Sequence, residues 1–410
     1  MILLIKMAWR NILRNKRRTI VSALALSMGL TAMIFLDAFM NGMLINMVNS
    51  GTSTFPGEAQ VHRESFRETM EVERFINNSK EIVLNLEREE SVKNVSPRVQ
   101  AFGMISSAAD MHSVVINGVY PQKEKDISKI NNAIIKGSFL EDDDERAIVL
   151  GERAADILDV GLEERIVVTV AQAGTGEMSQ EMLRVKGIFK TGIRELDSNV
   201  VLIPVKRAQS MLALGENYHE IAVTFNDFYT SWDDENPIWG KYSTDENLFR
   251  NWKELMPELE AMLEMSSYMK YVIGVILFLL VAGVIINTMF MTIYERMFEF
   301  GVIKAIGEKP SKVGGLIVLE SGFIAFLASV AGIVFGLILQ VIFTKFEVYD
   351  FSGSEFVSVT ITEKINPLMT LEQYTVFPLV LIIFTMIIGV YPAIHAARIN
   401  PSEAIKKGQK

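Results

Sequence analysis

Residues 271–293 read YVIGVILFLLVAGVIINTMFMTI, an apolar stretch without a charged side chain. A helix needs about 20 apolar residues to cross the hydrocarbon core of a bilayer, so this stretch decides the class of fold. Three more mainly apolar stretches of comparable or greater length occur at 19–44, 313–344 and 374–395. The sequence therefore predicts a membrane protein with four transmembrane α-helices.

The long segment between the first two stretches has a different composition. Residues 45–266 contain 23 Lys and Arg against 38 Asp and Glu, whereas the other 188 residues contain 17 against 11. Patterns of alternation and helical periodicity predict strands at 58–62, 113–119, 166–171, 185–189 and 220–225, and helices at 81–88, 153–158 and 251–265. We therefore predict a large α+β domain in water between helices 1 and 2, with residues 227–247 as an exposed insertion.

Basic residues at the ends of the four stretches predict their orientation. They precede the first stretch, lie between the second and third, and follow the last, so both termini and the middle loop are expected in the cytoplasm. The predicted segments are a cytoplasmic amphipathic N-terminal helix on the inner membrane surface at 1–18, transmembrane helix 1 at 19–44, an extracytoplasmic α+β domain at 45–266, transmembrane helix 2 at 271–293, a cytoplasmic loop at 294–312, transmembrane helix 3 at 313–344, a short extracytoplasmic loop at 345–373, transmembrane helix 4 at 374–395 and a cytoplasmic tail at 396–410.

Several classes of function are excluded or disfavoured by residues that the chain lacks. Without cysteine it has no disulfide, zinc-thiolate site, iron–sulfur cluster or cysteine nucleophile. The four histidines lie far apart in the sequence, and we expect no metal site. The acidic balance argues against nucleic acid as a partner. No phosphate-binding loop, nucleophile elbow or zinc-protease motif is present, so we expect no catalytic residue, and any nucleotide energy must come from another chain.

Three separated motifs resemble one family. The segments 8–19 (AWRNILRNKRRT), 295–307 (ERMFEFGVIKAIG) and 391–405 (YPAIHAARINPSEAI) are similar to the entry, the middle cytoplasmic loop and the C-terminus of MacB/FtsX-like ABC-transporter permeases. The resemblance implies a permease that carries no cofactor itself and works in a dimer with a second copy or a paralogue. It also implies a separate ATPase subunit that holds ATP and Mg.

Shorter motifs in the outer domain discriminate within this family. The segments 187–192 (GIFKTG), 252–257 (WKELMP) and 56–61 (PGEAQV) resemble the transmembrane subunits of lipoprotein-releasing systems. This resemblance implies a location in the inner membrane, a lipoprotein substrate extracted by mechanotransmission, and a periplasmic carrier that receives it. Two alternatives stay open: a macrolide- or peptide-export permease that works with an outer-membrane duct, and an FtsX-like transmitter of signals to a cell-wall hydrolase.

The middle cytoplasmic loop is the candidate for coupling to the ATPase. Phe298, Val302, Ile303 and Ile306 are spaced to form one apolar face of a short helix on the membrane surface, which would leave Glu299, Lys304 and Lys309 to bond a partner. Gly307 can end that helix, and Pro310 blocks its continuation. The predicted coupling residues are Glu299, Gly301, Val302, Lys304, Ala305 and Gly307.

Polar and small residues inside the stretches are further candidates. Glu320 lies seven residues into the third stretch, where a charge is costly, so we expect it to pair with a neighbouring helix. Ala328, Gly332 and Gly336 form a small-residue ridge that predicts a close helix contact.

Asp37 and Asn41, one turn apart near the outer end of the first stretch, either lie at the interface or line the mouth through which a substrate leaves the bilayer. Met33 and Met40 on the same helix either accept varied acyl chains or face membrane lipid for no special reason.

Overall fold

The computed structural model describes most of the chain as two compact units. The described residues are 2–244, 246–345, 355–356, 359–360, 366–402 and 404. One unit comprises residues 1–44, 264–350 and 364–410, and the other comprises residues 45–263 and 351–363. Most of the predicted loop at 345–373 and part of the tail at 396–410 lie outside the described residues.

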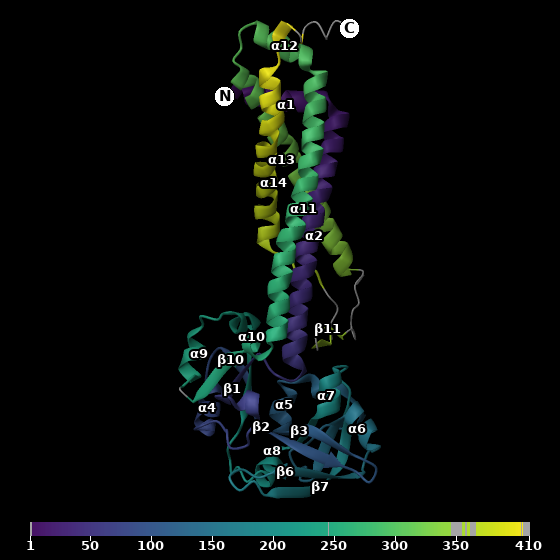
Figure 1. Cartoon of the computed structure of the whole chain (residues 1–410), viewed down its shortest axis with the longest axis vertical. Coiled ribbons are helices and arrows are strands. Elements are labelled where there is room, and N and C mark those ends of the chain that lie inside the picture. The colour runs from purple at the N-terminus through teal and green to yellow at the C-terminus, as the bar shows by residue number, and fades with distance from the viewer. Residues whose placement is uncertain are drawn as a thin grey trace. The chain divides into compact units, whose positions relative to one another are not determined.

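Four long helices contain the four predicted spans (Figure 1). They are α2 (Lys16–Thr54), α11 (Pro257–Glu295), α13 (Pro310–Lys345) and α14 (Leu371–Arg398). Each is long and apolar enough to cross a membrane, which confirms the prediction of four transmembrane helices. With 39 residues each, α2 and α11 extend for roughly 58 Å, well beyond the apolar stretches that they contain.

Small residues bring α13 close to α2, as the sequence predicts. A Cβ atom built on Gly332 would lie 2.9 Å from Cδ2 of Leu30, and one on Gly336 would lie 3.2 Å from Cγ2 of Ile34. The hydroxyl of Thr31 donates a hydrogen bond of 3.2 Å to the carbonyl oxygen of Gly332. The two backbones therefore approach to a distance that larger side chains would prevent.

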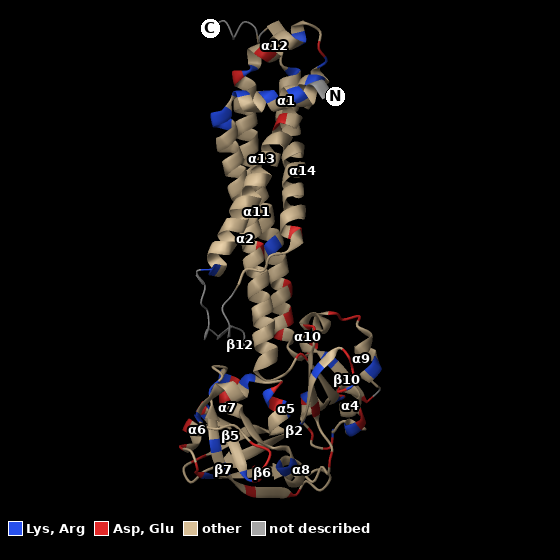
Figure 2. Cartoon of the chain, turned by 180° about the vertical axis from the view of Figure 1, so that it is seen from behind, with Lys and Arg blue, Asp and Glu red and all other residues tan. Residues whose placement is uncertain are grey.

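The short helix α1 (Ile2–Arg14) lies across the bundle near its upper end in Figure 2. Ile12 is buried in the core of the bundle, and the ring of Trp9 contacts that of Phe323 edge to face at 5.4 Å. Of the apolar side chains expected on one face of this amphipathic helix, Ile5 and Leu13 remain exposed. The helix thus packs on α13 with part of that face, and its contact with the membrane surface stays a prediction.

The second unit is built on one ten-stranded sheet, whose hydrogen-bonded order is β10-β1-β9-β2-β3-β8-β5-β7-β4, with β6 paired to both β2 and β7. The pairs β3–β8 and β5–β7 are parallel, and the other pairs in this sheet are antiparallel. The strands are β1 (Ala59–Arg63), β2 (Val92–Ser106), β3 (Met111–Val119), β4 (Ile134–Gly137), β5 (Ala147–Gly151), β6 (Arg165–Ala171), β7 (Met178–Phe189), β8 (Val200–Pro204), β9 (Glu220–Phe225) and β10 (Asn247–Asn251), and the described residues also form the short pair β11 (Glu355–Phe356) and β12 (Val359–Thr360).

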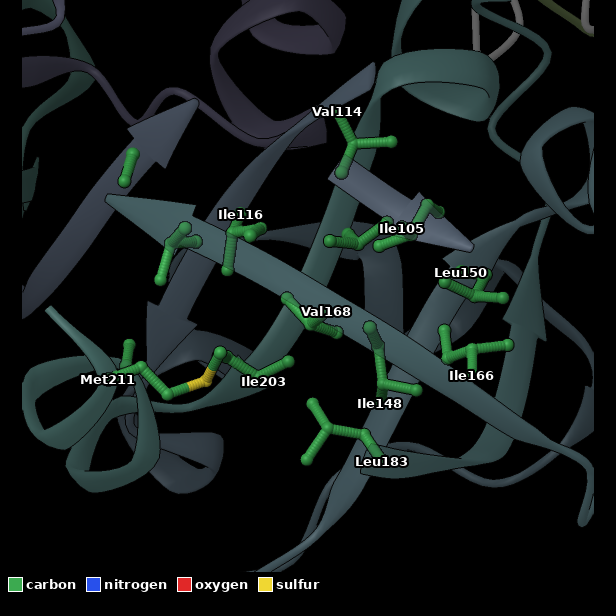
Figure 3. Packing of buried hydrophobic residues seen from close by; sticks show 14 of the residues in the cluster. Ile105, Val114, Ile116, Ile148, Leu150, Ile166, Val168, Leu183, Ile203 and Met211 are labelled. Atoms are coloured by element: carbon green, nitrogen blue, oxygen red, sulfur yellow. The ribbon is translucent and has the colours of Figure 1, made fainter. Parts of the chain in front are cut away.

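Short helices complete this unit, which confirms the predicted α+β domain between the first and second spans. They are α3 (Phe66–Thr69), α4 (Ser79–Leu86), α5 (Pro121–Lys125), α6 (Glu152–Leu158), α7 (Arg194–Asn199), α8 (Val205–Met211), α9 (Pro237–Tyr242) and α10 (Trp252–Leu255), with 3-10 turns at Lys129–Ala133 and Phe228–Trp232. Figure 3 shows the largest core, in which Ile148 of β5, Val168 of β6 and Leu183 of β7 pack together.

The expectation of an exposed insertion at 227–247 is wrong in part. Ile238 and Tyr242 of α9 are buried, and the ring of Trp239 lies 5.0 Å from that of Phe249. The described acidic residues of this segment are exposed, whereas Trp239 and Tyr242 pack against Phe249 of β10. The amino-acid composition of this segment does not separate its acidic residues from its aromatic residues, so composition alone overestimates how much of the segment is exposed to solvent.

A buried charged cluster fixes the chain where it leaves α2. The guanidinium of Arg98, on β2, donates two hydrogen bonds of 2.9 and 2.7 Å to the carboxylate of Glu124, on α5, and a third to Glu220, on β9. It also donates a bond of 2.7 Å to the carbonyl oxygen of Phe55, the residue directly after α2, and lies 4.2 Å from the centre of the Phe55 ring. Arg98 is fully buried, so these contacts replace its hydration.

Candidate functional site

The helix α12 (Met297–Ala305) occupies the predicted cytoplasmic loop. Gly307, at φ +97°, ends it as the sequence predicts, because this backbone conformation favours glycine. Val302 and Ile303 of the predicted apolar face are half-buried and Phe300 is fully buried, whereas Phe298 and Ile306 of that face are 45% and 81% exposed. Phe300 packs into the bundle core, so α12 presents those two residues to the surroundings.

A charged network fixes the start of α12. Arg296, between α11 and α12, donates hydrogen bonds of 2.7 and 3.0 Å to the two carboxylate oxygens of Glu320 on α13. The amide of Asn11, on α1, donates a bond of 2.7 Å to the same carboxylate. Arg296 also donates a bond of 3.0 Å to Glu299, which accepts another of 2.6 Å from Arg14. The expectation that Glu320 pairs with a neighbouring helical segment is confirmed.

Two of the side chains that the sequence assigned to a partner are used within the chain. Lys304 donates hydrogen bonds of 2.8 and 2.6 Å to the carbonyl oxygens of Ala397 and Ile399, at the end of α14. Glu299 is held by the two arginines, which lower the pKa of its carboxyl below the usual value even though burial acts in the opposite direction. A cation such as Lys304 is favourable at a helix C-terminus, where backbone carbonyls lack intrahelical partners.

The other predicted coupling residues lie around this network. Gly301 is buried, Val302 is half-buried, and Ala305 and Gly307 are exposed next to Ile306. The surface that α12 offers is therefore apolar at its C-terminal end, and α12 is braced from α1, α13 and α14. The role of the six predicted residues in coupling stays a prediction.

Asp37 and Asn41 belong to a second polar cluster at the other end of the same bundle. The carboxylate of Asp37 accepts hydrogen bonds of 2.9 Å from Asn41 and 2.8 Å from Gln373, and lies 3.2 Å from Nζ of Lys270. Lys270 also donates to the amide oxygen of Asn41. The cluster thus ties α2 to α11 and to the first turn of α14.

The predicted methionines are half-buried on α2, and Met33 lines a small apolar crevice with Phe278 of α11 and Leu381 of α14. A role for Asp37, Asn41, Met33 or Met40 in lining a substrate path stays a prediction. Among the described residues, no group of three or more His, Asp and Glu is placed to hold a metal ion.

Arg296, Lys270 and Gln373 are the site residues that the sequence reading missed. The sequence indicates Arg296 only as one of the basic residues between the second and third stretches, although a buried carboxylate on the following span requires a nearby cation. Lys270 likewise directly precedes the second apolar stretch. The contact of Lys270 with Asp37 joins charged residues near the same ends of successive spans, whereas Arg296 lies beyond the second stretch and Glu320 lies seven residues inside the third.

Two models of protein families match this sequence, and together they cover most of the described features. The C-terminal domain model of FtsX-like permeases matches residues 271–401, and the model of the MacB-like periplasmic core domain matches residues 19–231, more than half of the chain. The chain belongs to the MacB/FtsX-like permease family. It is therefore a multi-pass membrane protein and an ABC-transporter permease, and permeases of this kind work with an ATPase subunit.

Curated relatives of the permease resemble it along most of their length. Lipoprotein-releasing system transmembrane protein LolC of Xylella fastidiosa is 21% identical over 77% of this chain and 78% of its own length. LolC of Neisseria meningitidis is 21% identical over 80% of each chain. An uncharacterized ABC transporter permease of Methanocaldococcus jannaschii is 24% identical over 70% of this chain and 69% of its own.

Solved structures similar to the permease include the periplasmic region of MacB from Actinobacillus actinomycetemcomitans. This region is 12% identical, with a TM-score of 0.35, and the match covers 50% of this chain and 94% of that one. The extracellular domain of the ABC-type transporter YknZ is 16% identical, with a TM-score of 0.31, and the match covers 42% of this chain and 88% of that one.

Proposed function

We propose that this permease extracts lipid-anchored proteins from the outer leaflet of the inner membrane and passes them to a periplasmic carrier. The likeness to LolC over about 80% of both chains supports this substrate class. Both termini and α12 would lie in the cytoplasm, as the basic residues at the span ends indicate. ATP and Mg would be bound by a separate ATPase subunit, and a second copy or a paralogue would complete the dimer.

The network at the start of α12 supports transmission of force into the bundle. Arg296 bonds Glu320 on α13, Glu299 bonds Arg14 on α1, and Lys304 bonds the end of α14. An ATPase that moved the exposed end of α12 would therefore pull on three other helices through contacts already in place. Since α11 runs unbroken from Pro257 to Glu295, motion at its cytoplasmic end can be carried along the helix.

Reconstitution tests the proposed substrate. The permease and its ATPase are placed in proteoliposomes with a fluorescent triacylated lipoprotein, and ATP-dependent release to a soluble acyl-binding carrier is measured. We expect release of the acylated protein and none of the same protein with its lipid-bearing cysteine replaced by serine and anchored by a transmembrane helix. ATP hydrolysis without release of the acylated cargo would contradict the proposal.

Two alternative functions remain, and co-purification from native membranes distinguishes them. The match to the MacB-like periplasmic core domain favours export of a macrolide or peptide as the second candidate. A co-purified duct adaptor without lipoprotein would support export, whereas a co-purified cell-wall hydrolase would support an FtsX-like signalling role. Acylated lipoproteins in the complex would support extraction.

A further inference from the structure

A short segment of the chain lies directly on α2 at Gly42. It consists of residues 366–370, which lead into α14, and we call it the strap. The strap and this part of α2 belong to the same compact unit. The backbone N–H of Leu368 donates a hydrogen bond of 2.8 Å to the carbonyl oxygen of Ala38. A Cβ atom built on Gly42 would overlap the carbonyl oxygen of Asn366, so the strap reaches α2 only because position 42 has no side chain.

One side chain of α14 ties the strap to α2 a second time. The side-chain amide of Gln373 donates hydrogen bonds of 3.1 Å to the carbonyl oxygen of Leu368 and 2.8 Å to the carboxylate of Asp37. Its amide oxygen accepts a bond of 3.2 Å from the backbone N–H of Thr370, the N-cap of α14. Gln373 is fully buried, so these bonds replace its hydration. The strap, α2 and the first turn of α14 are therefore held together by one hydrogen-bonded cluster.

The presence of a glycine at position 42 is explained by the strap. Glycine in the interior of a helix is destabilising relative to alanine, because it loses more conformational freedom on folding. The nearest atoms to a Cβ on Gly42 are backbone atoms of Asn366 and Leu368, which cannot rotate away as a side chain can. At Gly29, on the same helix, the nearest atom would be a side-chain carbon of Val281 at 3.2 Å. Position 42 is thus fitted to the backbone of the strap.

This fit allows one register of α2 against the strap. The residues next to Gly42 are Asn41 and Met43, and both have side chains. A helix rises 1.5 Å and turns by about 100° per residue, so a screw movement of α2 by one residue would place a side chain against the carbonyl oxygen of Asn366. The same movement would break the backbone hydrogen bond between the strap and α2. Because closely packed contacts adopt discrete arrangements, the strap is either seated on Gly42 or released from it.

We propose that the strap is a releasable clasp, seated on Gly42 in the resting permease and displaced when the ATPase drives α2. The inference rests on the ATP-driven movement of the helices proposed above and not on the identity of the cargo. While the strap is seated, α2 is held to α14 through Gln373 and to α11 through the contact of Asp37 with Lys270. A shift of α2 against α14 therefore requires release of the strap.

Labelling of single cysteines tests the clasp, because the chain has no cysteine of its own. Pro367 lies between the two points at which the strap contacts α2 and is buried, whereas Met369 is 46% exposed. Pro367→Cys and Met369→Cys are introduced separately into the full-length permease, which is assembled with its ATPase in nanodiscs and treated with a charged maleimide. The rate of labelling of the permease chain is followed by mass spectrometry, without nucleotide and during ATP turnover.

We expect Pro367→Cys to react at least tenfold faster during ATP turnover than without nucleotide, whereas Met369→Cys should react at the same rate in both states. Equal rates for Pro367→Cys in a complex that hydrolyses ATP would overturn the proposal. Rapid labelling of Pro367→Cys without nucleotide would also overturn it, because the strap would then not be seated in the resting permease.

A second substitution in the Pro367→Cys protein should release the strap without ATP. Gly42→Ala adds the Cβ atom that overlaps the strap, so we expect labelling without nucleotide to be at least tenfold faster. Gly283→Ala, on α11, is the matched control, because no heavy atom of the described residues, apart from the backbone of the helix itself, lies within 4 Å of a Cβ built there. It should leave the labelling slow.

Gln373→Met gives an independent route to release if Gly42→Ala does not fold. It keeps the size of the side chain but removes its hydrogen bonds to the strap and to α2, so it should also speed labelling without nucleotide. Thermal melting checks the folding of each variant, and slow labelling in every folded variant would contradict the clasp. These measurements contain no lipoprotein, so failure of the clasp and failure of lipoprotein extraction are observed separately.

Discussion

The guanidinium of Arg296 and the carboxylate of Glu320 form two hydrogen bonds, of 2.7 and 3.0 Å, across the loop that contains α12. Both side chains are at least 90% buried, and their partners Asn11 and Glu299 come from α1 and α12. A buried ion pair contributes little net stability by itself, but it defines one arrangement of the segments that it joins. Here it defines how α12 is attached to the bundle.

Replacing Glu320 with alanine should destabilise the purified permease by about 3–5 kcal/mol, because the charge of Arg296 would remain buried without its main partner. Thermal unfolding in detergent, followed by tryptophan fluorescence, measures the change. The double variant Arg296→Met/Glu320→Met removes both charges and should recover most of the loss. If Glu320→Ala melts at the wild-type temperature, the pair does not hold the bundle together.

Substitution of Gly332 with valine should separate α2 from α13. The new side chain would meet Leu30, and overpacking of this kind costs about 1–3 kcal/mol. Gly315→Val is the matched control on the same helix, because no heavy atom of the described residues, apart from the adjacent backbone of the helix itself, lies within 4 Å of a Cβ built at Gly315. Melting temperatures of the two variants measure the difference, and equal values would contradict the close contact.

The exposed apolar end of α12 should be needed for attachment of the ATPase. Ile306 is 81% exposed, and Ile306→Glu should weaken co-purification of the ATPase at least tenfold while leaving the melting temperature unchanged. Leu371→Glu is the control, because Leu371 is 80% exposed at the start of α14, at the far end of the bundle. Undiminished recovery of ATPase with Ile306→Glu would remove α12 from the interface.

Acid should destabilise the second unit, which contains the ten-stranded sheet, through His219. This histidine accepts a hydrogen bond of 3.0 Å from the backbone N–H of Gln100, and its other ring nitrogen donates to the carbonyl oxygen of Val72 at 2.8 Å. Burial lowers the pKa of His219 from 6.5 to about 4. The unfolded chain therefore binds more protons between these values, so stability falls as pH decreases from 6.5 to 4, by about 3 kcal/mol.

Melting of the permease from pH 7.5 to 3 tests this dependence. His219→Gln can keep both hydrogen bonds without titrating, so its melting temperature should change less with pH than that of wild type. His112→Gln, at a half-buried histidine of β3, is the matched control substitution. Below about pH 4.5 a second loss is expected from Glu220: Arg98 and His62 lower the pKa of its carboxyl to about 2 against the effect of burial. An unchanged slope in His219→Gln would contradict the assignment to His219.

Local properties of the sequence were sufficient for the membrane architecture. The length of each apolar stretch and the acidic composition of the segment between the first two stretches are properties of consecutive residues. They were enough to predict the four helices and the α+β domain. The same holds for the ridge at Gly332 and Gly336, because residues four apart share one helix face. The end of α12 at Gly307 could also be predicted from local sequence, because it depends on the backbone conformation of that one residue.

Strand β2 was not predicted, because it contains polar residues whose burial only the tertiary structure explains. Residues 92–106 include Pro97 and Arg98 and show no simple alternation. Arg98 can be buried there because Glu124 and Glu220, 26 and 122 residues away, supply the opposite charges. No short window of sequence contains this compensation.

The tertiary structure also determines which residues pair with the charged residues of the bundle. The sequence alone determined that a carboxylate at position 320 needed a partner, because a bare charge among apolar residues is costly. Only the folded chain decided that Arg296 supplies it, and that Glu299 and Lys304 are held within the bundle. The need for compensation is set by one residue and its surroundings, whereas the identity of the partner depends on the distance between side chains after the helices have packed.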